Sequence, residues 1–319
     1  MAQRDLRDLT RYRTSLVRER ARQVNRVQKL LEGANIKLAS VASNVLGVSG
    51  RAMLEALVAG QTDAAAIATL ARGRLREKLP ELERALTGVV RAHQRFLLAQ
   101  QLAHIDFLDE EVAAVSEEIA RRVEAMGQEQ PPTAGTGSPG DDRAPADSQD
   151  TPLAPAEAVA LLDTIPGVDQ RLAEMIVAEL GTDMGRFPSA AHAAAWAGLA
   201  PGNYESAGKR YAGRIRQGNA ALRSGLVQAA WSSLHMKDTY LAAQYRRLVG
   251  RRGKKRAIVA VAHSILVIVY YMLRRHEPYH EQGGNYFDER KKQSVVDRLL
   301  KRVERLGYNV TLEPKMVAA

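Results

Sequence analysis

A serine inside a glycine-rich, basic segment is the residue of this chain best suited to covalent chemistry. Ser206 lies in residues 198–219, where glycines alternate with cationic side chains. A serine hydroxyl attacks a phosphodiester when a base or a metal ion takes its proton and cations stabilise the transition state. The cations that could serve here are Lys209, Arg210, Arg214, Arg216 and Arg223. Nothing near Ser206 in the sequence supplies a base, so spacing alone favours a turn-forming serine over a nucleophile.

The other reactive groups of the chain have spacings that predict no site. Asp5 with Asp8, and Asp106 with Asp109, show the one-turn spacing that a metal site could use. Both pairs lie in amphipathic helical patterns, where a carboxylate is usually solvated. The histidines show no spacing typical of zinc ligands. The chain has no cysteine, which excludes disulfides, cysteine-bound zinc and thiol nucleophiles.

The basic charge of the chain is concentrated around this serine. The formal net charge is +10, and residues 201–275 alone hold 15 basic and 2 acidic side chains. Such a block is either a solvated face or a surface that binds phosphates, and the scarcity of acidic partners favours phosphates. We therefore expect residues 209–256 to bind nucleic acid. Asn219 is expected to cap the helix that follows it and to contribute to the same surface.

Two long helices are predicted in the N-terminal part. Apolar residues spaced by threes and fours run from Leu6 to Leu31, and Gly33 is the expected stop. A second pattern, close to a heptad repeat, predicts a continuous helix over residues 81–126, about 69 Å long. We expect this helix to form a coiled coil or a long hairpin that either spaces two domains or pairs two chains, and we favour the pairing of chains into a homo-oligomer. Residues 127–155 are rich in Pro, Gly, Ser and Asp and predict a flexible linker.

Residues 156–280 are predicted to form a second, helical domain. Two short helices joined by the turn at 164–168 are typical of a helix-hairpin-helix, whose turn can hold a DNA phosphate near Gly167. A tight corner between two helices is the alternative interpretation of the same turn. Asp169 is expected to cap the second of these helices, and Gly181 to end it.

The apolar run at residues 258–273 predicts a buried core helix. It is shorter than the about 20 residues that a membrane-spanning helix needs, so we expect no membrane partner. Residues 1–30 carry eight arginines and one lysine and have no apolar signal-peptide region, which favours a cytoplasmic protein. Residues 281–319 form a basic tail whose role no motif indicates.

Several ordered motifs resemble the IS-one-ten family of bacterial insertion-sequence transposases, which are described as bridge-RNA-guided DNA recombinases. The resemblance runs from residue 1 to about residue 280, apart from the linker. The motifs of the N-terminal part are LRDLTRYR at 6–13, NR at 25–26 and SGRAML at 49–54. Those of the C-terminal part are IPGV at 165–168, AELG at 178–181, GLAP at 198–201, SAGKR at 206–210, and GN at 218–219 followed by LR at 222–223.

The resemblance implies a composite active site. In the family, a RuvC-like domain supplies an acidic tetrad that binds Mg²⁺, and a C-terminal domain supplies a serine that is transiently joined to a DNA phosphate. That serine corresponds to Ser206. The tetrad lies upstream of the motif that begins at Leu6, and only five residues precede Leu6, so the metal ligands are expected to be missing here. A truncated remnant, a misplaced start codon and a shortened protein that acts with a partner are the open explanations, and the first two are favoured.

We therefore expect a mainly α-helical protein. Its expected parts are a helical region with a long coiled-coil helix at 1–126, the linker at 127–155, a transposase domain at 156–280 with a helix-hairpin-helix-like turn and a small loop or hairpin, and the tail at 281–319. The expected function is DNA strand cleavage and rejoining in transposition, with structured guide RNA as a further partner and with an incomplete catalytic site in this chain. The alternative is a non-catalytic nucleic-acid-binding module that joins the oligomers of an intact relative and modulates it.

Overall fold

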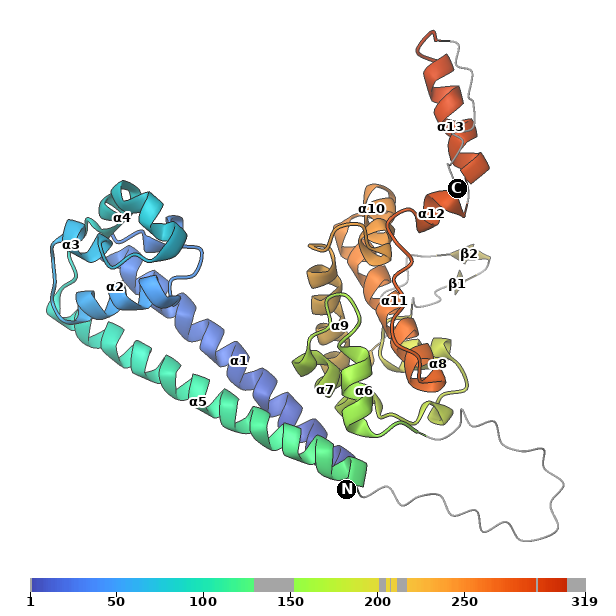
Figure 1. Ribbon diagram of the computed structural model, residues 1–319, viewed down its shortest axis with the longest axis horizontal. Helices are drawn as coiled ribbons and strands as arrows, with labels where there is room; N and C mark the ends of the chain where they lie inside the picture. Colours follow the sequence, from blue (N-terminus) through green and yellow to red (C-terminus); the bar gives the residue numbers. More distant parts are fainter. Residues whose placement is uncertain are drawn as a thin grey trace, which may run out of the picture. The chain divides into compact units, whose positions relative to one another are not determined.

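The computed structural model describes residues 2–128, 152–200, 205–206, 208–210, 217–290 and 292–308. These residues are mainly helical, as the sequence predicted, and the strands among them are the short β1 (Glu205–Ser206) and β2 (Lys209–Arg210) (Figure 1). The chain divides into two compact units, Asp8–Arg122 and a second one that combines Met1–Arg7 with Val123–Ala319. Most of the linker predicted at 127–155 falls outside the described residues.

The unit Asp8–Arg122 consists of two long helices and a group of short ones. The long helices are α1 (Ala2–Gly33), which ends at the predicted glycine, and α5 (Ala92–Gln128). The short elements are the 3-10 helices η1 (Leu38–Ser40) and η2 (Gly73–Lys78) and the helices α2 (Val48–Val58), α3 (Ala64–Ala68) and α4 (Leu79–Leu86). Figure 1 shows α2, α3 and α4 gathered where α1 ends and α5 begins, and their apolar side chains form one core with those of the long helices.

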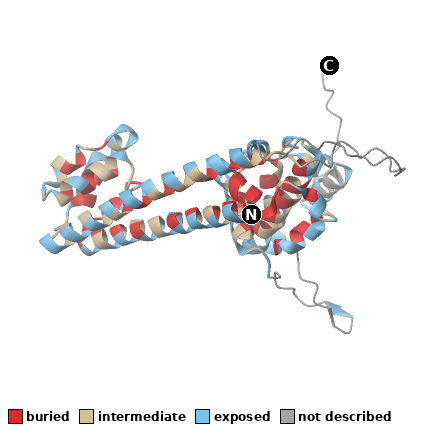
Figure 2. Ribbon diagram, turned by 90° about the horizontal axis from the view of Figure 1, so that it is seen from below, coloured by how far each residue is buried: buried red, intermediate tan, exposed pale blue. Residues whose placement is uncertain are grey.

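Ion pairs and apolar contacts hold α1 against α5. The guanidinium of Arg20 pairs with the carboxylate of Asp109. Leu16 is buried together with Leu108 and Val112, and Figure 2 marks buried residues at intervals along both helices. The apolar seam of α5 is therefore filled by α1 of the same chain, so this seam is not free to pair two chains.

The continuous helix predicted over residues 81–126 is wrong, because α4 ends at Leu86 and α5 begins only at Ala92. The break is required by close packing against the end of α1. A Cβ atom on Gly88 would lie 2.4 Å from the carbonyl oxygen of Ala34, and the amide of Val89 donates to that oxygen at 3.1 Å. The spacing of apolar residues within 81–126 cannot reveal this contact with a distant part of the chain.

The second unit is built around α11 (Lys254–Arg275). The helices that pack on it are α6 (Pro155–Leu162), α8 (Ala190–Trp196), α9 (Ala220–Ser233) and α10 (Tyr240–Arg252). Among the described residues, α11 is the one helix long and apolar enough to cross a membrane, but ten of its residues are buried in this unit. Burial against neighbouring helices therefore accounts for its apolar composition.

Four further elements complete this unit. They are α7 (Gln170–Leu180), η3 (Met184–Arg186), α12 (Tyr286–Glu289) and α13 (Lys292–Glu304). Asp169 caps α7 as predicted, since its carboxylate accepts from the amide of Leu172 at 2.9 Å. The start of the predicted tail packs on α10, where Phe287 stacks on Tyr240 with ring centroids 5.1 Å apart.

Candidate nucleic-acid interface

The serine predicted as a nucleophile lies in a short β-hairpin. β1 and β2 pair antiparallel, with Ser206 opposite Lys209 and Glu205 opposite Arg210. Gly208 in the turn has a φ of +74°, a left-handed conformation that glycine adopts without strain, and open space surrounds it. The backbone therefore brings Ser206 and Lys209 into one cross-strand pair.

The structure places some of the cations predicted around Ser206. Lys209 is exposed. Arg223 is half-buried on α9 and interacts with other residues of the protein. Arg214 and Arg216 lie outside the described residues, as do the side chains of Ser206 and Arg210. Lys209 is therefore the predicted cation that the structure describes as open to a ligand at the hairpin.

The two ends of the segment that carries the hairpin meet at a point that we call the root. A Cβ atom on Gly218 would come within 2.4 Å of the Gly198 nitrogen, so only glycine permits this approach. The amide of Asn219 donates to the carbonyl oxygen of Trp196 at 3.3 Å. The chain thus leaves the end of α8 and reaches the start of α9 at one place, which fixes both ends of the serine-bearing segment.

Asn219 holds this root through both atoms of its side-chain amide. Its Oδ1 accepts from the amide of Leu222 at 3.1 Å, which is the predicted cap of α9. Its Nδ2 donates to Oε2 of Glu179 at 2.6 Å. The Glu179 side chain is fully buried. Both polar atoms of the Asn219 side chain are thus hydrogen-bonded within this unit. The contact of Asn219 with nucleic acid stays a prediction.

The first residues of α1 close the same buried site. The Arg7 guanidinium lies 3.2 Å from Oε2 of Glu179 and also donates to the carbonyl oxygens of Ala178 and Glu179. Gln3 donates to the carbonyl oxygens of Val177 and Ala178 at 2.8 and 2.7 Å. These carbonyls lie in the last turn of α7, where the helix dipole favours a cation.

Sequence reasoning missed the role of Arg7 and Glu179 because their partners are far away in the chain. Arg7 and Glu179 are 172 residues apart. The arginine-rich pattern of the first helix indicated a solvated or nucleic-acid-binding face, and nothing in the AELG motif shows that its glutamate is buried. Arg7 lies in the motif LRDLTRYR and Glu179 in the motif AELG. Their place in these family motifs is the one sequence signal that could have pointed to them.

His263 of α11 also contacts the root. Burial lowers the pKa of His263 below its ordinary value, and a hydrogen bond to the Leu199 backbone only partly offsets this effect. Its Nδ1 atom is buried and finds no partner among the described residues. The imidazole is therefore neutral near pH 7 and carries a free lone pair beside the start of the serine-bearing segment. Histidine spacing in the sequence had predicted no role for it.

An exposed cluster of cations lies at the turn between α10 and α11. We call it the basic corner, and its members are Arg251, Arg252, Lys254, Lys255 and Arg256. No ion pair joins them to any residue that the structure describes. Lys254, Lys255 and Arg256 occupy the first turn of α11, where the helix dipole repels cations. Helix stability therefore does not explain these three cations, whereas binding of an anion would offset their repulsion.

The turn predicted to hold a phosphate packs against α9. Ile165, Pro166 and Val168 are buried, and a Cβ atom on Gly167 would lie 2.4 Å from the carbonyl oxygen of Ala229. Gly167 also has a φ of +88°. Close packing of helices accounts for this glycine, in line with the alternative interpretation of the turn. Phosphate contact at Gly167 stays a prediction that this packing does not support.

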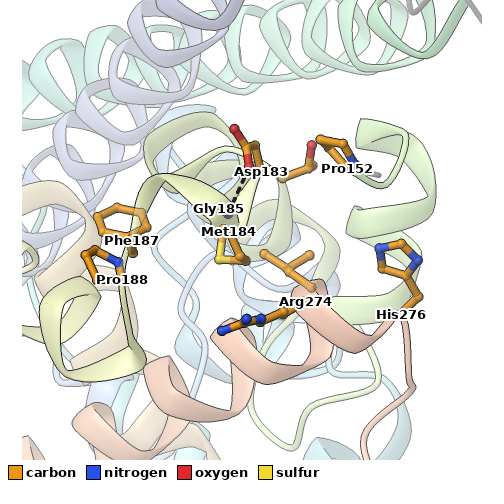
Figure 3. A pocket seen from close by; sticks show the side chains of 10 residues that line it. Pro152, Asp183, Met184, Gly185, Phe187, Pro188, Arg274 and His276 are labelled. Carbon is orange, nitrogen blue, oxygen red and sulfur yellow. Dashed lines mark hydrogen bonds between the residues drawn. The ribbon is translucent and has the colours of Figure 1, made fainter. Parts of the chain in front are cut away.

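A small hollow lies between η3 and the end of α11 (Figure 3). It measures about 180 Å³, and Asp183 and Arg274 are among its lining residues. The Asp183 carboxylate accepts from the amide of Gly185 at 2.9 Å, and Arg274 donates to the Tyr270 hydroxyl at 3.1 Å. Both charged groups are therefore hydrogen-bonded to neighbouring residues of the protein. Within the described ranges, no group of three His, Asp or Glu side chains is placed to hold a metal ion.

Residues 159–246 match the model of the Transposase IS116/IS110/IS902 family. The matched residues run from α6 into α10 and include the β-hairpin and its root. No curated protein matches the chain. The match supports the family that the sequence motifs indicated, through the part of the chain that carries Ser206.

Proposed function

We propose that this protein is a DNA-binding transposase of an insertion sequence and that Ser206 is its nucleophile. The match of residues 159–246 supports the general function. The observation that carries the proposal for Ser206 is the register of the hairpin, which sets this residue opposite the exposed Lys209. A cation beside the attacking hydroxyl would hold the phosphate and offset the charge that develops on it.

The basic corner is the proposed contact with the DNA backbone. Three of its cations lie at the end of α11 that repels them, and phosphates bound there would remove this repulsion. Contacts with phosphates position a protein on DNA without reading its sequence. They also release counterions, so binding through the basic corner should weaken steeply as the salt concentration rises.

The proposed reaction is a transesterification at a DNA phosphate. The Ser206 oxygen forms a bond to phosphorus while the bond from phosphorus to a deoxyribose oxygen breaks. The serine proton passes to a base, and the departing oxygen takes up a proton. A hydroxyl of another DNA end then attacks the same phosphorus and releases the serine. Because a phosphodiester is retained at each stage, the rejoining step requires no external energy source.

Mg²⁺ is the metal that the family resemblance implies. When bound, it would activate the attacking hydroxyl and offset charge at the phosphate. The described residues gather no ligand set to which it could be assigned. Structured RNA is a second proposed partner, because the phosphates that the basic corner fits occur in both nucleic acids.

The experiment that tests the nucleophile compares Ser206→Ala with Ser224→Ala, an exposed serine on α9. Strand transfer is measured with end-labelled DNA, Mg²⁺ and the RNA of the insertion sequence, and covalent protein–DNA adducts are sought under denaturing conditions. We expect Ser206→Ala to abolish transfer and adduct while it binds DNA as the parent does, and Ser224→Ala to retain all three properties. Transfer by Ser206→Ala at the parent rate would refute the proposed role.

A non-catalytic nucleic-acid-binding module is the second candidate function. The basic corner favours it, because this surface binds phosphates without any nucleophile. The module would join the oligomers of an intact relative and dampen their activity. DNA binding by the parent chain without any cleavage, in the presence of Mg²⁺ and RNA, would support this candidate over the enzyme.

Self-association is also proposed, through a surface other than the filled seam of α5. Phe96 and Phe107 are 64% and 54% exposed on α5. Their separation of eleven residues is close to three helical turns, so they lie on one side of the helix. Sedimentation of the parent and of the Phe96→Glu, Phe107→Glu double variant tests this surface, since the variant should be the smaller species.

A further inference from the structure

An open hollow between α9 and α10 lies outside both the serine hairpin and the basic corner. It measures about 460 Å³, which is within the usual range of ligand pockets. Its walls come from the connection between the two helices, residues 234–238, and from the first two turns of α10. A hollow of this size fits a small flat ligand rather than a segment of duplex DNA.

One aromatic side chain lines this hollow, and a second one packs against it. Tyr245 lines it and packs against Trp231 of α9, with ring centroids 6.0 Å apart. Trp231 is 45% exposed, so a large part of its indole ring is open to solvent. Nucleobases stack on exposed aromatic side chains of this kind, and the stacking tolerates any base because every base has a π-face.

Cations complete the lining. Lys237 and Arg246 are exposed residues of the wall, and His235 lies beside them. The Nε atom of Arg246 donates to the carbonyl oxygen of Ala242 at 3.3 Å, which holds its guanidinium at the hollow. Asp238 is the acidic residue of the lining, so the lysine and arginine leave a net positive charge. A ligand with an aromatic ring and a negative group matches this combination.

Helix α10 connects the hollow with the basic corner. Arg252 lies six residues beyond Arg246 on this helix, a separation of about 9 Å along the axis. A nucleic-acid strand of a few nucleotides spans this distance. Phosphates held at the basic corner would therefore bring the neighbouring bases to the hollow.

We infer that the hollow between α9 and α10 binds an unpaired nucleotide of the strand that the basic corner holds. Its base stacks on Tyr245, beside the exposed ring of Trp231, and its phosphate pairs with Lys237 and Arg246. The inference rests on the proposed function, because cleavage and rejoining of strands leave nucleotides near the break unpaired. Bases inside a duplex are stacked on one another and do not enter the hollow.

Fluorescence of Trp231 tests this inference directly. The chain has two tryptophans, so a Trp196→Phe variant leaves Trp231 as the reporter. The variant is titrated with a single-stranded oligothymidylate of about 16 nucleotides and with a duplex of the same length. We expect saturable quenching by the single strand and none by the duplex. No quenching at saturating single strand, or equal quenching by the duplex, would overturn the inference.

Substitution of Tyr245 supplies an independent measurement. Loss of one stacked base should weaken binding of the single strand by about 5- to 150-fold in Tyr245→Leu. Tyr245→Phe retains the ring and should bind as the parent does. Tyr271→Leu is the control, since this tyrosine is exposed and lies on α11 under Arg275, away from the lining of the hollow. Equal affinity of Tyr245→Leu and the parent for the single strand would contradict the inference.

Duplex binding separates this inference from the proposed function. Tyr245→Leu should bind duplex DNA with the affinity of the parent, which also shows that the variant is folded. Alanine substitutions at the basic corner should weaken duplex binding. Unchanged duplex binding in those variants would refute the proposed DNA interface, whereas unquenched Trp231 beside normal duplex binding would refute only the nucleotide site.

Discussion

The anchoring of the serine-bearing segment by Asn219 can be measured by removing its side chain. In Asn219→Ala, α9 loses its cap, and the buried carboxylate of Glu179 loses the donor that lies 2.6 Å from Oε2. Loss of a cap costs about 1 kcal/mol. A buried acceptor left without its partner costs about 1–3 kcal/mol more. Because Arg7 still faces Glu179, we expect a total loss of about 2–3 kcal/mol in the free energy of unfolding.

A second cap in the same unit serves as the matched control. Asp169 accepts from the amide of Leu172 at 2.9 Å, much as Asn219 accepts from Leu222 at 3.1 Å, and its hydrogen bond is exposed. Asp169→Ala should therefore cost only about 1 kcal/mol. The difference between the two variants isolates the contribution of the bond to Glu179. Asn219→Ser retains a capping hydroxyl and should fall between them.

Urea unfolding followed by tryptophan fluorescence is the appropriate assay. Both tryptophans belong to the unit that combines Met1–Arg7 with Val123–Ala319, so their signal follows the unfolding of this unit. Free energies are obtained by linear extrapolation to zero urea. Asn219→Asp adds a test of charge, because its carboxylate would face that of Glu179 and stability should fall as the pH rises above about 4.

Equal losses in Asn219→Ala and Asp169→Ala would refute the reasoning. That result would mean that the bond between Asn219 and Glu179 contributes nothing beyond an ordinary helix cap. A flat pH dependence of Asn219→Asp would lead to the same conclusion, because two adjacent carboxylates, one of them buried, cannot both be ionised without cost.

Three further predictions concern the root and the basic corner. Gly218→Ala should lose about 1–3 kcal/mol of stability in the same urea assay, because its Cβ atom would meet the Gly198 backbone, and parent-like stability would show that the root has room to relax. Alanine at all five positions of the basic corner should lower the slope of log K against log salt for duplex DNA by up to about 4, and an unchanged slope would exclude this surface from the interface. Stability of the parent should fall as the pH drops below the ordinary pKa of His263, because the unfolded chain takes up the proton more readily than the buried imidazole. Thermal unfolding of His263→Gln should lack this part of the pH dependence, and identical pH profiles of variant and parent would contradict it.

Local signals predicted much of the helical framework. Gly33 ends α1, Asp169 caps α7, and Asn219 caps α9, each as the sequence indicated. The apolar run at 258–273 lies within the central helix α11. These features depend on residues within about one turn of each other, so their spacing in the sequence determines them.

Contacts between distant residues determine two features that local patterns do not reveal. The helix predicted across residues 81–126 breaks because Gly88 packs against Ala34. Gly167 packs against Ala229 of α9, a contact that the sequence did not indicate, while its contact with phosphate stays a prediction. In both cases the glycine is required by a backbone that approaches from another part of the chain, and periodicity within one helix contains no information about that approach.

In the candidate site, too, some features follow from the sequence alone and others from tertiary contacts. The sequence by itself determined the serine, its glycine-rich surroundings and the concentration of positive charge, because composition and order of residues specify these directly. Only the tertiary structure decided that Asn219 binds the buried Glu179, that Arg7 closes the same site, and that Tyr245 lines a hollow and packs against Trp231. Packing selects partners by distance in space, and residues 40 or 172 positions apart acquire a common environment only when the chain folds.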